Sequence, residues 1–212
     1  MYVPAHFEES RPEEIRRLLH EFPLGMLVTH GTAGLDAVHI PFEVDPGEAL
    51  PAVLTGHVAR ANPVWQAVRE GDEVLVVFRG VEAYVSPNWY PSKHEQHRQV
   101  PTWNYQVVHL HGRIFVHEDE AFLRGIVARL TRTNEARAGQ SPPWRMADAT
   151  PEYIAQLLGA IVGLEVRVER IVAKSKLSQN KDARDRESVI AAMDAGGAGG
   201  VAEAMRRSRP AT

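Results

Sequence analysis

Hydrophobic and polar positions alternate along much of the chain, and this period of two predicts β-strands. Eight stretches carry the pattern: LGMLVTH (24–30), LDAVHIPFEV (35–44), AVLTGHV (52–58), EVLVVF (73–78), EAYVS (82–86), WNYQVVHLHG (103–112), RIFVH (113–117) and IVGLEVRVERIVA (161–173). Turn sequences separate the first of them, with GTAG at 31–34 and a break at DPGEALP, 45–51. Seven or eight strands with mostly short connections favour an antiparallel barrel.

Apolar residues at helical spacing occur mainly toward the two ends of the chain. We expect helices over 10–22, after Asn62, over about 118–134, from Thr150, from Asp182, and after the GGAGG run at 196–200. Residues 87–101 hold three prolines and no sustained period, which predicts a surface loop. The expected fold class is mainly β with peripheral helices, of the α+β type. Residues 1–193 form its domain, and residues 194–212 form a Gly-rich linker with a flexible C-terminal helix.

Composition narrows the classes of function. The 212 residues contain no cysteine, which excludes disulfides, thiolate metal sites and a cysteine nucleophile, and fits a cytoplasmic protein. The N-terminal stretch lacks a secretory signal pattern, and no window approaches the length of a membrane span, so we expect no membrane association. A net charge of -3 gives no general attraction for nucleic acid.

The stretch TGHVARANPVW, residues 55–65, combines features that suit a phosphate. A strand ends near Gly56 and His57, the chain turns through Arg60, and a helix is expected after Asn62. Free N–H groups at a helix start and a guanidinium are both good phosphate ligands. The alternative is that Arg60 stabilises a surface turn and Asn62 caps the helix.

Two further groups could contact a ligand. KLSQNK, residues 176–181, offers amines, amides and a hydroxyl, although Ser, Gln and Asn are also common in solvated turns. Around the proline-rich segment, aromatic and polar side chains alternate in AYVSPNWY and VPTWNY, as expected of a pocket for a flat ring, of a plugged barrel end or of a subunit interface.

Two histidine pairs are candidate metal ligands. His109 and His111 share one strand face, and His94 and His97 stand three residues apart. No thiolate or suitably spaced carboxylate completes either pair, so we expect no metal site.

Six motifs together resemble the PaiB-type family of FMN-binding negative transcriptional regulators. In chain order they are MYVPAHF, HIPF, GHVARANPVW, AYVSPNWY, VPTWNY with VHLHG, and KLSQNK, and they span residues 1 to about 193. The resemblance implies a split β-barrel like that of the pyridoxamine phosphate oxidase group. It also implies a homodimer with FMN at the subunit interface.

The resemblance also implies roles for the motif residues. Arg60, with Ala61 and Asn62, would hold the FMN phosphate, and His39, Ile40 and Pro41 of HIPF would line the isoalloxazine ring. His57 would also contact the cofactor. Thr102, Trp103 and Asn104 would approach the flavin or its open side. The residues that would close the site are Lys176, Ser178, Gln179, Asn180 and Lys181.

Three functions stay open at this point. A regulator would act through its flavin, a metabolite or a partner protein, because the chain shows no helix-turn-helix pattern or basic stripe for direct DNA binding. An FMN-dependent oxidoreductase would pass electrons to a small substrate. A haem-handling split-barrel protein would ligate iron through His109 or His111.

Overall fold

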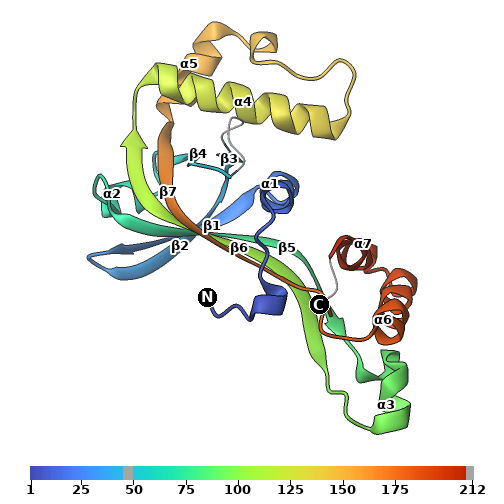
Figure 1. Cartoon of the computed structure of the whole chain (residues 1–212). Coiled ribbons are helices and arrows are strands. Elements are labelled where there is room, and N and C mark those ends of the chain that lie inside the picture. The colour runs from blue at the N-terminus through green and yellow to red at the C-terminus, as the bar shows by residue number, and fades with distance from the viewer. Residues whose placement is uncertain (45–49, 209–212) are drawn as a thin grey trace. The chain divides into compact units, whose positions relative to one another are not determined.

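The structure is a computed structural model that describes residues 1–44 and 50–208. Within that part of the chain, seven strands form one antiparallel sheet in the order β2-β1-β5-β6-β7-β4-β3 (Figure 1). Their bounds are β1 Leu24–Gly31, β2 Gly34–Pro41, β3 Glu43–Val44, β4 Val53–Ala59, β5 Glu73–Val85, β6 Thr102–His117 and β7 Ile161–Lys176. The α+β fold class is confirmed. The predicted break at 45–51 lies mostly outside the described residues, as do the last four positions of the C-terminal segment.

The helices are mostly where helical spacing predicts them. Their bounds are α1 Pro12–Glu21, α2 Val64–Ala67, α3 Pro91–Gln96, α4 Glu120–Ala138, α5 Pro151–Gly159, α6 Ala183–Ala195 and α7 Gly199–Arg207, with 3-10 turns at Ala5–Phe7, Pro87–Trp89 and Met146–Asp148. Thr150 and Asp182 cap α5 and α6, since their side chains accept hydrogen bonds from the N–H groups of Tyr153 and Asp185. No described helix is both long enough and apolar enough to cross a membrane.

Two of the predicted strand breaks are wrong. β5 runs through Gly80 and β6 runs through Gly112, so each predicted pair is one long strand. A Cβ on Gly112 would lie 2.1 Å from the carbonyl oxygen of Arg167, and one on Gly80 would lie 2.9 Å from Leu18. Both glycines therefore permit close packing against a neighbour, which is the other common use of glycine inside a strand.

The expected loop over 87–101 is also wrong in part, because it contains a 3-10 turn and α3. Pro87 and Pro91 each stand at the start of a helical turn, where a missing N–H does no harm. Ser92 at the start of α3 is buried, and its N–H and hydroxyl donate to the carboxylate of Asp185 at 2.9 and 2.5 Å. These bonds tie α3 to α6.

The chain divides into two compact units, each of which has its own packed interior. The first unit comprises Met1–Leu18, Arg79–Val108 and Val172–Thr212, and the second comprises Leu19–Phe78 and His109–Ile171. In the second unit, α4 packs beside α5 through a cluster of Leu123, Ile154 and Leu158. Both units include parts of the long strands β5, β6 and β7.

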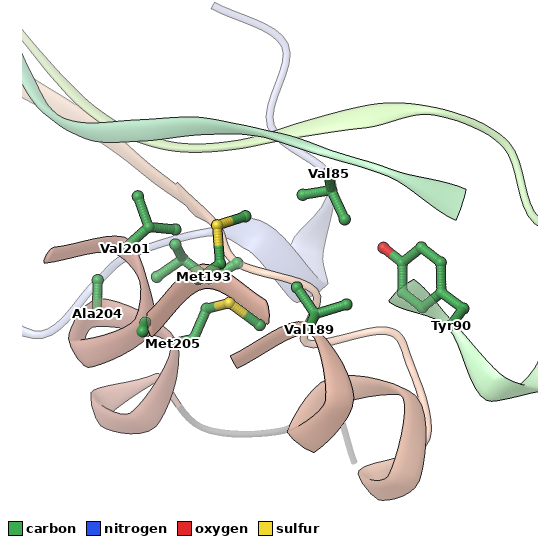
Figure 2. Close-up of a cluster of buried hydrophobic side chains, with 9 residues drawn as sticks. Val85, Tyr90, Val189, Met193, Val201, Ala204 and Met205 are labelled. Atoms are coloured by element: carbon green, nitrogen blue, oxygen red, sulfur yellow. The ribbon is translucent and has the colours of Figure 1, made fainter. Parts of the chain in front are cut away.

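In the first unit, α6 and α7 pack side by side and build a core of their own (Figure 2). Val201, Ala202, Ala204 and Met205 of α7 are all buried, and they pack with side chains of α6 and of the end of β5. The sequence suggested a flexible helix behind a Gly-rich linker. The described part of that segment instead contributes core, because one face of α7 is apolar and is covered by α6.

Candidate functional site

In the second unit, Arg60 lies at the end of β4 with its guanidinium held in one orientation. Its Nε donates to the carbonyl of Gly159 at 2.9 Å, and Nη2 donates to the carbonyl of Ile161 at 3.2 Å. Nη1 donates to Glu118 at 2.5 Å. A guanidinium has five N–H groups, so two of them remain for another acceptor.

The backbone around Arg60 is mostly paired already. The N–H of Arg60 donates to the carbonyl of Ala160 at 2.8 Å, and the N–H of Asn62 donates to that of Ala59 at 2.8 Å. The Asn62 side chain accepts from the N–H of Val64 at 3.0 Å, at the start of the one-turn helix α2. Asn62 thus stabilises the turn just before α2, whose N-cap position is Pro63, and Ala61 lies in the turn between Arg60 and Asn62.

The HIPF segment lies next to β4 in the same unit. A Cβ on Gly56 would lie 3.0 Å from Ile40 and 3.1 Å from the carbonyl oxygen of Pro41, so this glycine permits a close approach of the two segments. Ile40 is buried, whereas His39 and Pro41 are exposed on either side of it. Of these three side chains, His39 and Pro41 are the ones that a ligand could reach.

His57 is the orphaned polar group of this region. Its Nδ1 is buried without a hydrogen-bond partner among the described residues, and burial lowers the pKa of its imidazole. The side chain is therefore neutral at physiological pH and can accept or donate one further hydrogen bond.

In the first unit, most of the other predicted residues line one cavity of about 170 Å³. Its lining is Phe7, Tyr90, Val100, Thr102, Asn104, Lys176, Ser178, Asn180 and Lys181. Lys176 Nζ donates to the hydroxyl of Thr102 and to the carbonyl of Trp103, the latter at 2.8 Å. Lys181 Nζ donates to Gln99 Oε1 at 2.6 Å. The structure thus brings the 102–104 and 176–181 motifs together.

Two predicted residues of this group do not line the cavity. Gln179 is buried. Its amide oxygen accepts from the N–H of Leu177 at 2.7 Å, and its amide nitrogen donates to the carbonyl of Ser175 at 2.5 Å, so this side chain stabilises the turn. Trp103 is 53% exposed, and its ring meets that of Tyr84 edge to face at 6.2 Å.

Two cavity residues, Phe7 and Val100, were not predicted, whereas Tyr90 belongs to the AYVSPNWY aromatics expected around a pocket for a flat ring. Phe7 and Val100 belong to the quoted motifs MYVPAHF and VPTWNY, but no spacing rule indicated that these two motifs would meet. The roles assigned to the Arg60 group and to the Lys176 group stay predictions, and the two groups belong to different units.

The histidine pairs lie in different surroundings. Among residues 1–44 and 50–208, no three His, Asp or Glu side chains converge as metal ligands would. The rings of His109 and His111 lie 6.5 Å apart, and burial lowers the pKa of each. His94 is on α3, and His97 ends that helix with a φ of 56°.

A second hollow of about 390 Å³ lies in the second unit, where sequence reasoning assigned nothing. Side chains of α4 and of residues 143–146 line it, among them Thr131, Glu135 and Trp144. Its lining is mostly apolar, and no predicted site residue contributes to it.

Comparison with known proteins gives a family match and a related protein. A family model described as "Putative FMN-binding domain" matches residues 1–170. The protein named "Protease synthase and sporulation protein PAI 2" of Bacillus subtilis is 33% identical over 190 residues, which cover 90% of this chain and 87% of that protein.

Solved structures confirm the fold at low sequence identity. A conserved hypothetical protein from Mycobacterium tuberculosis has a TM-score of 0.60 at 12% identity, covering 86% of this chain and 94% of that one. A FAD and heme binding protein from Mycobacterium smegmatis has a TM-score of 0.56 at 17% identity, covering 85% and 78%. From the matched family model and the Bacillus relative it follows that this chain belongs to the PaiB-type family of FMN-binding split-barrel proteins.

Proposed function

We propose that the protein holds FMN with the phosphate at Arg60 and acts as a regulator through the state of that flavin or through a partner protein. The observation that carries the phosphate assignment is the anchored guanidinium. Two backbone carbonyls fix its orientation, and two N–H groups remain available. A preoriented guanidinium loses little entropy on binding an anion, which favours a phosphate at this position.

The donor set near Arg60 fits this group. The Arg60 side chain is 38% exposed, so a ligand can reach it, and the buried Nδ1 of His57, in the preceding strand β4, has no hydrogen-bond partner within the described part of the chain. When bound, FMN supplies one- and two-electron redox chemistry. In this proposal the protein's own residues bind and orient the flavin, with His39 and Pro41 against its ring.

A regulatory role is supported by the Bacillus relative, whose name refers to protease synthesis and sporulation. Direct DNA reading has little electrostatic support, because the net charge is -3. The protein therefore acts through a flavin-dependent contact with another molecule. At near-physiological salt, its affinity for DNA is no better than nonspecific binding.

The protein acts as a homodimer with the cofactor at the subunit interface. This part of the proposal is supported by an aromatic patch in the first unit, formed by Tyr84 and Trp103, which are 45% and 53% exposed and whose rings lie 6.2 Å apart. Exposed aromatic side chains are typical of interface cores. Sedimentation of the Trp103→Ser variant tests it, since loss of this patch weakens dimer formation.

Flavin titration tests the phosphate assignment. Flavin-free protein is titrated with FMN and with riboflavin, which lacks the phosphate, and flavin fluorescence is followed. Wild type prefers FMN, and Arg60→Ala loses that preference, by roughly 1.5–3 kcal/mol for a charge-assisted contact. Arg69→Ala, at an exposed arginine of the same unit, retains it. An unchanged FMN preference in Arg60→Ala would refute the assignment.

A further inference from the structure

The cavity of the first unit carries positive charge from two lysines. Lys176 and Lys181 both line it, and their ammonium groups donate to neutral oxygens of Thr102, Trp103 and Gln99, while that of Lys181 also lies 5.0 Å from the ring of Tyr90. Across residues 1–44 and 50–208, neither lysine forms an ion pair with an acidic side chain. The nearby carboxylate of Asp185 is already bonded by Ser92 and Gln99.

The charge of Lys176 is destabilised by its surroundings. Burial, followed by the positive charges of Lys174 and Lys181, lowers the pKa of Lys176. Lys174 does not line the cavity, and its ammonium lies 5.4 Å from the ring of Tyr105. An anion in the cavity would stabilise the charged form of Lys176.

A second, independent feature of the cavity is an unused hydroxyl. Tyr90 is 1% exposed, and its hydroxyl is buried without a hydrogen bond of normal geometry among the described residues. The Ser178 hydroxyl is close enough to offset part of the rise that burial causes in the Tyr90 pKa, but it is bonded to Asn104 at 3.1–3.2 Å. A buried donor without a partner is costly, so a ligand oxygen would stabilise it.

Backbone strain marks the same position. Ser178 adopts a φ of 63°, a conformation that is uncommon for residues other than glycine. This conformation is held by the Asn104 contact and by the Gln179 amide, which reaches back across Ser178 to the backbone of Ser175 and Leu177. Strain of this kind gathers at ligand sites, because the surrounding structure must enforce it.

The size of the cavity limits what it can hold. About 170 Å³ is smaller than the 300–1,000 Å³ typical of sites for drug-sized ligands, so a whole flavin does not fit. Phe7 and Val100 supply an apolar wall opposite the amines and hydroxyls. The chemistry suits a small molecule with one oxyanion group and a short apolar part.

We propose that this cavity binds the carboxylate or phosphate group of a small ligand other than FMN, with Lys176, Lys181, Thr102 and the Tyr90 hydroxyl as its donors. The family resemblance implied that the 176–181 motif closes over the flavin. The cavity geometry instead points to a separate anion site, built from residues of the first unit alone. This proposal stands without the assignment of FMN phosphate to Arg60.

Calorimetric titration with two probes, inorganic phosphate and acetate, tests the site on the FMN-loaded protein. We expect saturable binding of at least one probe, weakened about tenfold or more by Lys176→Gln and several-fold by Tyr90→Phe. Lys93→Gln removes a charge from a half-buried lysine of the same unit, one that donates to Asn88 and does not line the cavity, and should leave binding unchanged. Preference for phosphate identifies a phosphorylated ligand, and preference for acetate identifies a carboxylic acid.

Flavin affinity is measured on the same variants to separate this site from the cofactor site. Lys176→Gln should bind FMN as wild type does. A parallel loss of FMN affinity would assign the cavity to the flavin phosphate and overturn the proposal, as would the absence of saturable binding of both probes. If Lys176→Gln does not fold, as judged by its thermal melt, Lys181→Gln removes the second amine and serves in its place.

Discussion

Glu118 provides the sharpest test of the Arg60 assignment, because it occupies the guanidinium that the phosphate is proposed to use. The ion pair joins side chains that are 38% and 55% exposed, and pairs of this exposure contribute only about 0–1 kcal/mol. A carboxylate about 4 Å from a phosphate charge opposes binding by about 1 kcal/mol in water, and by more near a protein surface. Glu118→Gln should therefore bind FMN about fivefold more tightly or better at low salt.

The assay is a flavin fluorescence titration at two ionic strengths. The gain in Glu118→Gln should shrink at high salt, since the Debye length falls to about 3 Å at 1 M, which is shorter than the separation assumed for the two charges. Riboflavin, which carries no phosphate, should show no gain. In an Arg60→Ala background the Glu118→Gln effect should differ, because the two side chains are in contact. A Glu118→Gln protein that binds FMN no more tightly than wild type would contradict the reasoning.

Three predictions concern the stability of the fold. Burial would raise the pKa of Glu14, but hydrogen bonds from Arg17 and Gln106 lower it below the ordinary 4.5. The stability that this carboxylate contributes is therefore lost as pH falls through the lowered pKa. Glu14→Gln should flatten the acid limb when the free energy of unfolding in urea is measured against pH. Gly112→Ala should lower the free energy of unfolding by about 1–3 kcal/mol or more, because the new methyl would overlap a backbone oxygen. Met205→Ala should cost about 2–5 kcal/mol in the same measurement, since Met205 is fully buried in the α6–α7 core.

Matched variants separate these causes from general effects of mutation. Glu13→Gln, at the exposed neighbour of Glu14, should leave the acid limb steep. Gly159→Ala has open space around the added methyl and should be neutral or slightly stabilising within a helix. An unchanged unfolding midpoint in Met205→Ala would favour the loosely attached C-terminal helix that the Gly-rich run suggested.

Local patterns in the sequence determined the secondary structure and the family. The alternation in 24–30 and 35–41 gives the β1–β2 hairpin, and Thr150 and Asp182 mark helix starts through their own side chains. These features depend on residues a few positions apart, so they can be read without knowing the fold. The quoted motifs likewise indicated the FMN-binding family, because each motif is a stretch of consecutive residues and their order can be read from the sequence.

Tertiary structure alone decided the rest, because it depends on residues distant in sequence. Glycine in a strand pattern fits a turn or a close approach, and only the neighbouring strand showed that Gly112 serves the second purpose. The hydrogen-bond acceptors of the Arg60 side chain are 58 to 101 positions away in sequence. The cavity of the first unit likewise brings together Phe7, Tyr90 and Lys176 from separate segments. Side-chain periodicity specifies which face of an element is buried, but it does not specify which distant element covers that face.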